Sequence, residues 1–331
     1  MSSRRARRII IVGHEGQDGR LLSEVIQQRG DDVFGVGRQR NASPFEVEGF
    51  GELRIDNKEA VRRIVAELQP AEIYYLAAYH FSAEDRDKVS AGEEYEKSLE
   101  VNVRGPLYFL EAVRGESPTS RFLYASSSLI FGPGGGLAPQ DESTPLAPVG
   151  AYATTKALAG QIVEAYRTRH GLFATTGILY NHESVHRKPG FVSRKIILGA
   201  LEILRGKAER LVLGDLNTVV DWGHAGDFVD AFTRILALDT PEDFVVATGE
   251  GHSVRDFAVT AFEAVGLEWR DHVEESAAVL GAKHGGRRGA PAKLERLTGW
   301  RPTVSFEQMV RRLVAETAEQ LDVTVAGRQK A

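Results

Sequence analysis

The stretch RRIIIVGHEGQDG, residues 7–19, runs from an apolar segment directly into a glycine-rich loop. Its first half is a continuous apolar run, which is typical of a strand buried on both faces of a parallel sheet. Gly13, Gly16 and Gly19 then form a G-x-x-G-x-x-G turn, and residues 20–29 have the period of a helix. Glycines at this spacing allow a pyrophosphate to approach the N-terminus of the helix. We therefore predict a strand, a loop and a helix that bind a dinucleotide, the alternative being a glycine turn without a ligand.

The rest of the first half repeats this alternation of apolar runs and amphipathic segments. Near-continuous apolar strands separated by helices indicate a parallel sheet with helices on both faces. We predict an α/β fold, a Rossmann-type doubly wound parallel sheet. The expected order is strand 32–38, helix 57–68, strand 71–78, helix 93–114, strand 121–128, helix 151–170 and strand 172–181.

The pattern changes after residue 180, where a polar, loop-like segment precedes a helix expected at 191–206 and a short strand at 210–215. DFVVATG, residues 243–249, has the composition of another buried strand. We therefore predict an NAD(P)-binding Rossmann domain over residues 1–180, to which residues 216–255 return in part. Residues 181–215 and 256–331 are predicted to form a smaller C-terminal substrate-binding domain.

The composition excludes several classes of partner. The 331 residues include 41 Lys and Arg against 46 Asp and Glu, and the net charge of −5 gives no electrostatic basis for binding nucleic acid or an anionic membrane. No apolar span approaches the length of a signal-peptide core or a membrane helix. The absence of cysteine excludes disulfides and thiolate metal sites, which is consistent with a cytoplasmic protein, and we predict no metal site. A small molecule is the expected partner.

Two arginines follow the second expected strand, in GVGRQRN. A free ribose 2′-hydroxyl is usually bound by an Asp or Glu at this point, whereas a 2′-phosphate needs cations. Arg38 and Arg40 therefore favour NADP over NAD, unless they only form a solvated basic loop. The carboxylate of Glu15 would repel phosphates, so we expect it to point to solvent. Asp56 is expected either to accept a hydrogen bond from the adenine amino group or to be the N-cap of the next helix.

The segment AYATTKA places Tyr152 and Lys156 four residues apart, on one face of a helix. An ammonium group at this spacing can lower the pKa of the phenol and bind a nicotinamide ribose, so that the tyrosine acts as a base. A Tyr-x-x-x-Lys pair is common by chance. It becomes specific here because it follows a strand that ends in three serines, RFLYASSS.

With these motifs, the sequence resembles the extended short-chain dehydrogenase/reductases of the NAD-dependent epimerase/dehydratase group, and is most similar to the GDP-mannose 4,6-dehydratase family. The similarity extends from GHEGQDGRLL through AEIYYLAA, YASSSLIFG, AYATTKA and GLFATTGILYNHES to GFVSRKI, DWGHAGDFVDA and FVVATGEGHSVRDF. It implies a bound NADP or NAD, a nucleotide-diphosphate sugar as substrate, oxidation at sugar C4, and a homodimer or homotetramer. The cofactor-binding residues expected are Gly13, Gly16, Gln17, Asp18, Gly19, Arg38, Asp56, Leu76, Ala77, Ala78 and Lys156.

The sequence departs from the family at one catalytic position. The family has Ala-Ser-Thr-Ser-Glu after this strand, and the chain has Ala125-Ser126-Ser127-Ser128-Leu129. Ser127 matches the hydroxyl that binds the C4 oxygen, so the expected catalytic set is Ser127, Tyr152 and Lys156. Leu129 replaces the glutamate that removes the C5 proton and protonates the departing C6 hydroxyl, and leucine has no titratable group. We therefore expect C4 oxidation without dehydration, by a 4-epimerase or a 4-dehydrogenase/4-keto reductase.

Two alternatives stay open. The first is a GDP-mannose 4,6-dehydratase-type lyase with a substitute acid/base, for which His80, His182 and Glu183 are the candidates. The second is a catalytically silent protein that binds sugar nucleotides, against which the intact Ser127, Tyr152 and Lys156 argue.

The substrate site is expected along YNHESVHRKPGFVSRKI, residues 180–196. Arginines of the family that hold the nucleotide diphosphate are missing, because Val219 and Val220 replace one pair, and Arg287 or Arg288 offers a charge from a different backbone position. A GDP-sugar is therefore only weakly favoured. The substrate-binding residues expected are Ser128, Leu129, Asn181, Glu183, Arg194, Lys195 and Arg287.

Overall fold

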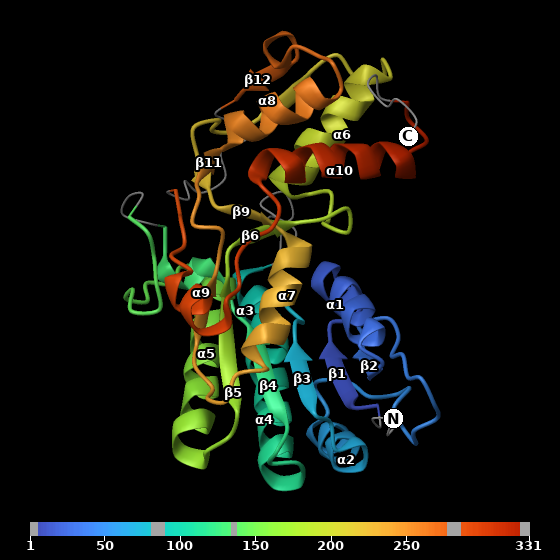
Figure 1. Cartoon of the computed structure of the whole chain (residues 1–331), viewed down its shortest axis with the longest axis vertical. Helices are drawn as coiled ribbons and strands as arrows, with labels where there is room; N and C mark the ends of the chain where they lie inside the picture. The colour runs from blue at the N-terminus through green and yellow to red at the C-terminus, as the bar shows by residue number, and fades with distance from the viewer. Residues whose placement is uncertain (1–5, 81–89, 134–137, 277–285, 325–331) are drawn as a thin grey trace.

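A six-stranded parallel sheet forms the centre of the computed structural model, which describes residues 6–80, 90–133, 138–276 and 286–324 (Figure 1). Its strand order is β2–β1–β3–β4–β5–β10, and each neighbouring pair is parallel. The prediction of a Rossmann-type α/β fold is confirmed. The strands are β1 (Arg8–Val12), β2 (Asp32–Val36), β3 (Glu72–Tyr75), β4 (Arg121–Ala125), β5 (Ala174–Leu179) and β10 (Phe244–Val246).

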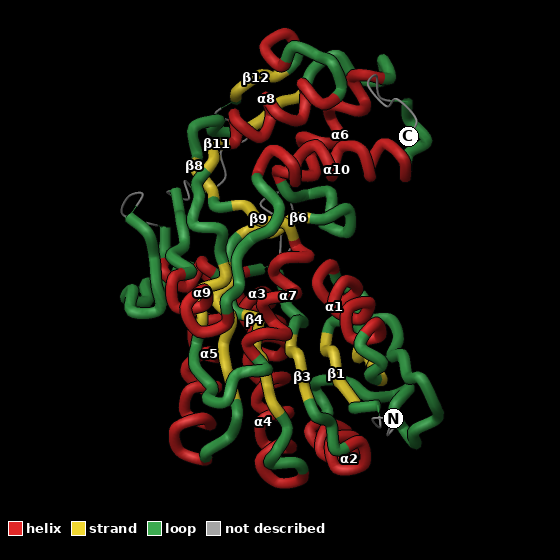
Figure 2. The backbone as a smooth tube through the Cα atoms, in the orientation of Figure 1, coloured by secondary structure: helices red, strands yellow, loops and turns green. Residues whose placement is uncertain are grey.

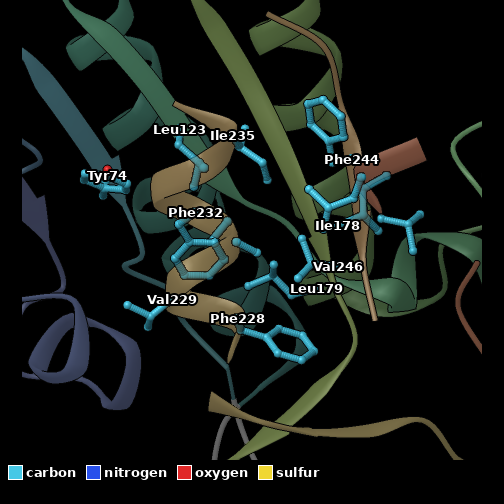
Figure 3. Packing of buried hydrophobic residues seen from close by; sticks show 14 of the residues in the cluster. Tyr74, Leu123, Ile178, Leu179, Phe228, Val229, Phe232, Ile235, Phe244 and Val246 are labelled. Atoms are coloured by element: carbon cyan, nitrogen blue, oxygen red, sulfur yellow. The ribbon is translucent and has the colours of Figure 1, made fainter. Parts of the chain in front are cut away.

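Helices cover both faces of this sheet, because successive strand side chains point to opposite faces and both sets are apolar. In β1, Ile9 and Ile11 pack on the face covered by α1 (Gln17–Gln28) and α7 (Ala225–Ile235), while Ile10 and Val12 pack on the opposite face. Figure 3 shows α7 side chains lying against β5 and β10 on the first face. The second face is covered by α2 (Lys58–Leu68), α4 (Gly105–Glu116) and α5 (Gly150–His170).

The prediction of one continuous helix over residues 93–114 is wrong, because a π-helical turn interrupts it. The chain forms α3 (Ala91–Leu99), a π-helical turn η2 (Glu100–Arg104) and then α4, with Pro106 in the first turn of α4. A π turn inserts an extra residue into the helix, and such turns often occur at functional sites. This one brings Asn102 into the interior, where its side chain is fully buried.

The C-terminal part has a hydrophobic core of its own, formed by α6 (Val192–Leu204), α8 (Val254–Ala264) and α10 (Phe306–Gln320). In Figure 2 this helical unit lies beyond one end of the main sheet, on the far side of the β6–β9 pair. β10 nevertheless belongs to the main sheet, as residues 243–249 were expected to. The boundaries of the two predicted domains stay a prediction. The remaining elements are η3 (Ser128–Phe131), β6 (Asn181–Glu183), β7 (Leu211–Leu213), β8 (Val219–Val220), β9 (Trp222–His224), β11 (His252–Ser253), η4 (Trp269–Asp271), β12 (Val273–Glu275) and α9 (Ala292–Thr298).

The strand expected at 172–181 is shorter than predicted. β5 ends at Leu179, and the chain then leaves the sheet so that Asn181–Glu183 pairs in parallel with Trp222–His224. This short pair carries the polar segment away from the sheet toward the C-terminal helices. In the described parts of the chain, no helix is long and apolar enough to cross a membrane.

Candidate active site

The glycine loop after β1 lies at the point where the strand order reverses, between β1 and β3, which is where ligands bind in sheets of this type. Gly13 has φ of +92°, and a Cβ there would lie 2.8 Å from the amide nitrogen of Ala77. A Cβ on Gly19 would lie 2.4 Å from the carbonyl oxygen of Gly13. A side chain at Gly13 would push apart the loops after β1 and β3, and one at Gly19 would clash within the glycine loop itself. Leu76 and Ala77 therefore lie against the glycine loop, and a cofactor role for Leu76, Ala77 and Ala78 stays a prediction.

The N-terminus of α1 opens onto this loop. Gly16 is the N-cap, is exposed, and supplies no side chain to cap the first amides of the helix. Free amides at a helix N-terminus favour an anion. The local structure therefore fits a dinucleotide pyrophosphate.

The side chains of Gln17 and Asp18 form hydrogen bonds with residues of β6 and the segment after it. The Gln17 amide donates to the carbonyl oxygen of His182 at 3.0 Å and accepts from the Ser184 hydroxyl at 2.9 Å. The Asp18 carboxylate lies 3.0 Å from Nε2 of His182. These contacts tie the first turn of α1 to β6, and a cofactor role for these two side chains stays a prediction.

Glu15 does not point freely into solvent, as we had expected. Its Oε2 accepts hydrogen bonds from the backbone amides of Arg38 and Gln39, at 3.0 and 3.1 Å. Desolvation raises the pKa of this carboxyl, but the two amides outweigh it and hold the pKa below its usual value. The Arg38 side chain itself is exposed.

Asp56 is not the N-cap of α2. Asn57 has that role and accepts from the amide of Ala60 at 3.0 Å. The Asp56 carboxylate instead pairs with Arg54 at 3.2 Å, near the surface. Contact with an adenine amino group stays a prediction.

Tyr152 and Ser127 meet at the carboxyl end of β4. Tyr152 lies in the first turn of α5, and its phenol forms a hydrogen bond with the Ser127 hydroxyl. Burial raises the pKa of Tyr152, while the Ser127 bond and the charge of Arg187 oppose that increase. The pair expected from the sequence is thus formed.

Lys156 is buried one turn further along α5, with 1% of its surface exposed. Its ammonium donates to the carbonyl oxygen of Ala125 at 2.7 Å and lies 5.8 Å from the centre of the Tyr152 ring. Burial lowers the pKa of Lys156 to about 7. The positive charge that lowers the pKa of Tyr152 in this structure is that of Arg187, whereas the Tyr-x-x-x-Lys spacing had predicted this effect for Lys156.

His80 and Phe191 complete the wall around Tyr152. The His80 ring packs edge-on against the Tyr152 ring with centroids 4.3 Å apart, and it stacks on Phe191 at 5.8 Å. The guanidinium of Arg187 lies over the Phe191 ring, 3.7 Å from its centre. An imidazole therefore lies beside the phenol expected at C4.

The three residues proposed as substitutes for the missing glutamate have different surroundings. Both ring nitrogens of His182 have partners, the Tyr180 carbonyl at 2.7 Å and the Asp18 carboxylate. Glu183 is 1% exposed and accepts from the Ser193 hydroxyl at 2.6 Å. Only His80, of the three, has its ring packed on Tyr152 in the described contacts.

The other expected substrate residues are spread along η3, β6, α6 and the C-terminal part. Ser128 is buried in η3 and Leu129 beside it is half-buried, with its amide donating to Ser127 Oγ at 3.3 Å. Arg194 is buried and donates to Thr317 of α10 at 2.5 Å, and Arg287 donates to the Gly132 carbonyl at 3.2 Å. Asn181 and Lys195 are half-buried. The substrate roles of all seven residues stay predictions.

Sequence reasoning missed Asn102. Its side-chain oxygen accepts from the amide of Tyr79 at 3.0 Å, and its side-chain nitrogen donates to Thr155 at 3.1 Å. It therefore joins the segment that carries His80 to the helix that carries Tyr152 and Lys156. A buried asparagine inside an expected helix was the available signal, because such a side chain needs hydrogen-bond partners.

Comparison with known proteins settles the family. The family model described as GDP-mannose 4,6 dehydratase matches residues 10–313. The chain belongs to the GDP-mannose 4,6-dehydratase family. It is 35% identical to GDP-mannose 4,6 dehydratase 2 of Arabidopsis thaliana, with 97% of this chain and 88% of the relative covered. The human GDP-mannose 4,6 dehydratase is 33% identical, with 94% and 91% covered.

Solved structures agree on the fold of this dehydratase family member. RMD from Pseudomonas aeruginosa complexed with NADPH superposes with a TM-score of 0.79 at 20% identity, covering 95% of this chain and all of that one. A UDP-glucose 4-epimerase from Thermotoga maritima with UDP-glucose gives a TM-score of 0.80 at 21% identity, covering 95% and 99%. At these identities the similarity concerns the fold alone.

The family assignment confirms the resemblance and overturns the main functional expectation. Relatives from a plant, a bacterium and an animal, at 32–35% identity, are all named GDP-mannose 4,6-dehydratases. The expectation of C4 oxidation without dehydration, drawn from Leu129 alone, is therefore wrong on this comparison. The absence of the family glutamate at position 129 shows that one acid/base group is missing. It does not show that dehydration is lost, because a neighbouring residue can supply the same proton transfer.

Proposed function

We propose that this chain is a nucleotide-sugar 4,6-dehydratase that converts a GDP-mannose-type substrate into its 4-keto-6-deoxy product. The observation that carries the proposal is the position of Tyr152, whose phenol bonds to Ser127 and whose ring packs against His80, in a chain of the GDP-mannose 4,6-dehydratase family. GDP as the nucleotide is supported by the names of the relatives. A homodimer or homotetramer stays a prediction from the resemblance.

The glycine loop supports a nicotinamide dinucleotide as cofactor. Any side chain at Gly13 or Gly19 would clash with backbone, so the loop keeps its tight turn only with glycine, and the uncapped amides of α1 suit a pyrophosphate. A nicotinamide dinucleotide, when bound, accepts the hydride that leaves C4 and returns it at C6. The other steps belong to side chains of this chain.

Tyr152 and Ser127 serve the oxidation at C4. The Ser127 hydroxyl holds the C4 oxygen, and the phenol of Tyr152 takes the proton of the C4 hydroxyl. Burial raises the pKa of Tyr152, and the Ser127 hydrogen bond and the charge of Arg187 make that increase smaller. Lys156 orients the ribose of the cofactor, as the resemblance implies.

The second half of the reaction needs a group that removes the C5 proton and then protonates the C6 oxygen. Leu129 cannot do either, and we assign both steps to His80. C5 is bonded to C4, so its base must lie within a few ångströms of the Tyr152 phenol, and the His80 ring lies against the ring of Tyr152. Histidine is the side chain that most often serves as general base and general acid in enzymes.

The proton balance closes with a single histidine. Neutral His80 takes the proton from C5, which the C4 ketone has made acidic, and becomes an imidazolium. The C6–O bond then breaks, the imidazolium protonates the departing oxygen, and water leaves while a C5–C6 double bond forms. Tyr152 then releases the proton of the C4 hydroxyl to solvent, and His80 takes up one proton from solvent and returns it to C5. A bound dinucleotide would supply the hydride at C6 that completes the 4-keto-6-deoxy sugar.

The test is incubation of the purified protein with GDP-mannose in D₂O, with the product followed by mass spectrometry and NMR. The proposal expects loss of one water and incorporation of deuterium. An inverted C4 without deuterium, or no change in the sugar while it binds, would overturn it. UDP-mannose in parallel, which differs from GDP-mannose only in the base, tests the preference for the base.

His80→Gln tests the assignment of the second half. We expect dehydration to fall by about 10²- to 10⁴-fold, while reduction of the bound cofactor by C4 oxidation persists. His170→Gln, at the exposed far end of α5, is the matched control and should keep full activity. Leu129→Glu introduced into the His80→Gln protein should restore part of the dehydration. Unchanged dehydration by His80→Gln would refute the role of His80 and leave the dehydratase proposal intact.

A further inference from the structure

Two glycines of the second strand and its loop make room for side chains of the phosphate-binding loop. A Cβ on Gly35 would lie 2.4 Å from the His14 ring, and a Cβ on Gly37 would lie 2.6 Å from Oε2 of Glu15. His14 Nε2 also lies 3.1 Å from the carbonyl oxygen of Arg40. The loops after β1 and β2 are therefore packed on each other through His14 and Glu15, and any larger residue at these glycines would separate them.

The loop after β2 is held in place independently of Glu15. Asn41 accepts from the amide of Gly37 at 3.0 Å and donates to the carbonyl oxygens of Phe50 and Leu53, each at 2.8 Å. Gly35 and Ala42 form an antiparallel bridge. The amides of residues 38 and 39 are thus fixed in direction, and the Glu15 carboxylate occupies both of them.

The end of the second strand is where proteins of this fold distinguish the two nicotinamide dinucleotides. A carboxylate there accepts a hydrogen bond from the free ribose 2′-hydroxyl, and cations there bind a 2′-phosphate. In this chain the carboxylate comes from the glycine loop, but it lies on the amides directly after β2. A 2′-phosphate would have to displace Glu15 from those amides or remain beside it.

Arg38 and Arg40 favour a 2′-phosphate, whereas Glu15 disfavours it, so the strengths of these two electrostatic effects must be compared. Both arginine side chains are exposed, and solvent and salt screen their attraction for a phosphate. Glu15 is half-buried and fixed by two backbone hydrogen bonds, so its charge cannot move away at low cost. Its lowered pKa keeps it ionised at neutral pH. A dianionic phosphate is repelled twice as strongly as a single charge would be, whereas a hydroxyl gains an acceptor.

We propose that Glu15 selects NAD(H) over NADP(H) as the cofactor of this chain. The inference rests on the proposed function only in that a nicotinamide dinucleotide is bound. It reverses the preference expected from the arginines alone. The carboxylate accepts from the ribose 2′-hydroxyl, and it excludes the 2′-phosphate by charge and by occupying the two amides.

The test is direct binding of NADH and NADPH to the purified protein, by isothermal titration calorimetry or nicotinamide fluorescence, without any sugar. We expect NADH to bind at least about tenfold more tightly than NADPH. Glu15→Gln removes the charge and keeps the size, and should shift the ratio by about tenfold or more toward NADPH. Glu46→Gln, an exposed acid in the loop after β2, is the matched control and should leave the ratio unchanged. Mass analysis of dinucleotide released on denaturation gives a second readout, expected to be NAD.

Each outcome has a separate meaning. Equal or tighter binding of NADPH by the wild-type protein would overturn the selection by Glu15, and so would an unchanged ratio in Glu15→Gln. Failure of both dinucleotides to bind would instead overturn the cofactor site on which the proposed function depends.

Discussion

Lys156→Met is expected to stabilise the protein freed of bound dinucleotide while it abolishes turnover. The ammonium is 1% exposed, and burial lowers the pKa of Lys156 from 10.5 to about 7. A shift of that size corresponds to about 5 kcal/mol of free energy of unfolding at neutral pH. Methionine fills the same volume without a charge but leaves the Ala125 carbonyl without the ammonium donor, which costs about 1–3 kcal/mol. The net expectation is a gain of about 2–4 kcal/mol.

The pH dependence separates this explanation from a general packing effect. Below about pH 7 Lys156 is protonated in both states, so the wild-type protein carries the full cost of a buried charge. Between about pH 7 and 10.5 the unfolded chain binds more protons than the folded chain, so wild-type stability rises with pH. The advantage of Lys156→Met should therefore be about 3 kcal/mol smaller at about pH 9.5 than at about pH 7.

The assay is urea unfolding at these two pH values, followed by the fluorescence of the buried Trp222 and Trp300. The slope of the free energy against urea should be the same for both proteins, so that midpoints compare stabilities. A variant less stable than the wild type at about pH 7 would refute the reasoning. So would an advantage that does not change with pH.

The remaining predictions concern three other residues. Desolvation lowers the pKa of His182, but the Asp18 carboxylate raises it by more, so the pKa lies above its usual value. The stability of the folded protein should therefore fall as pH rises through this raised pKa. His182→Gln should make this fall smaller, as thermal unfolding at several pH values can measure. Asn102→Ala should lower the free energy of unfolding by about 2–3 kcal/mol, because Tyr79 and Thr155 lose buried partners. Tyr152→Phe should reduce turnover by at least about 10²-fold and leave the Kd of the nucleotide sugar nearly unchanged, as calorimetry can measure.

The sheet was predictable from the sequence because its strands are apolar on both faces. The run at residues 9–12 has no polar side chain to expose, so both faces had to be covered, and the helices that cover them show the matching periodicity. The spacing of Tyr152 and Lys156 was equally informative, since four residues of helix bring two side chains to one face. These features depend on local patterns, which a sequence displays directly.

The missed features depend on contacts between distant segments. The packing of His80 on Tyr152 joins residues 72 positions apart, and it requires β3 and α5 to be placed first. The π turn at 100–104 follows from the hydrogen bonds that Asn102 finds in two other segments, and helical periodicity does not report them. Glu15 looked unfavourable in a phosphate-binding loop, because the amides that bind it belong to another loop.

The contacts of Gln17 and Asp18 with β6 make cofactor binding and sugar binding a linked equilibrium. The helical turn proposed to bind the pyrophosphate is bonded to His182 and Ser184, which begin the segment expected to hold the substrate. A ligand that orders one of these segments lowers the entropic cost of ordering the other. By reciprocity, the factor by which bound dinucleotide tightens the sugar nucleotide must equal the factor by which the sugar nucleotide tightens the dinucleotide. With positive coupling of this kind, the dinucleotide is held most firmly while the sugar nucleotide is bound.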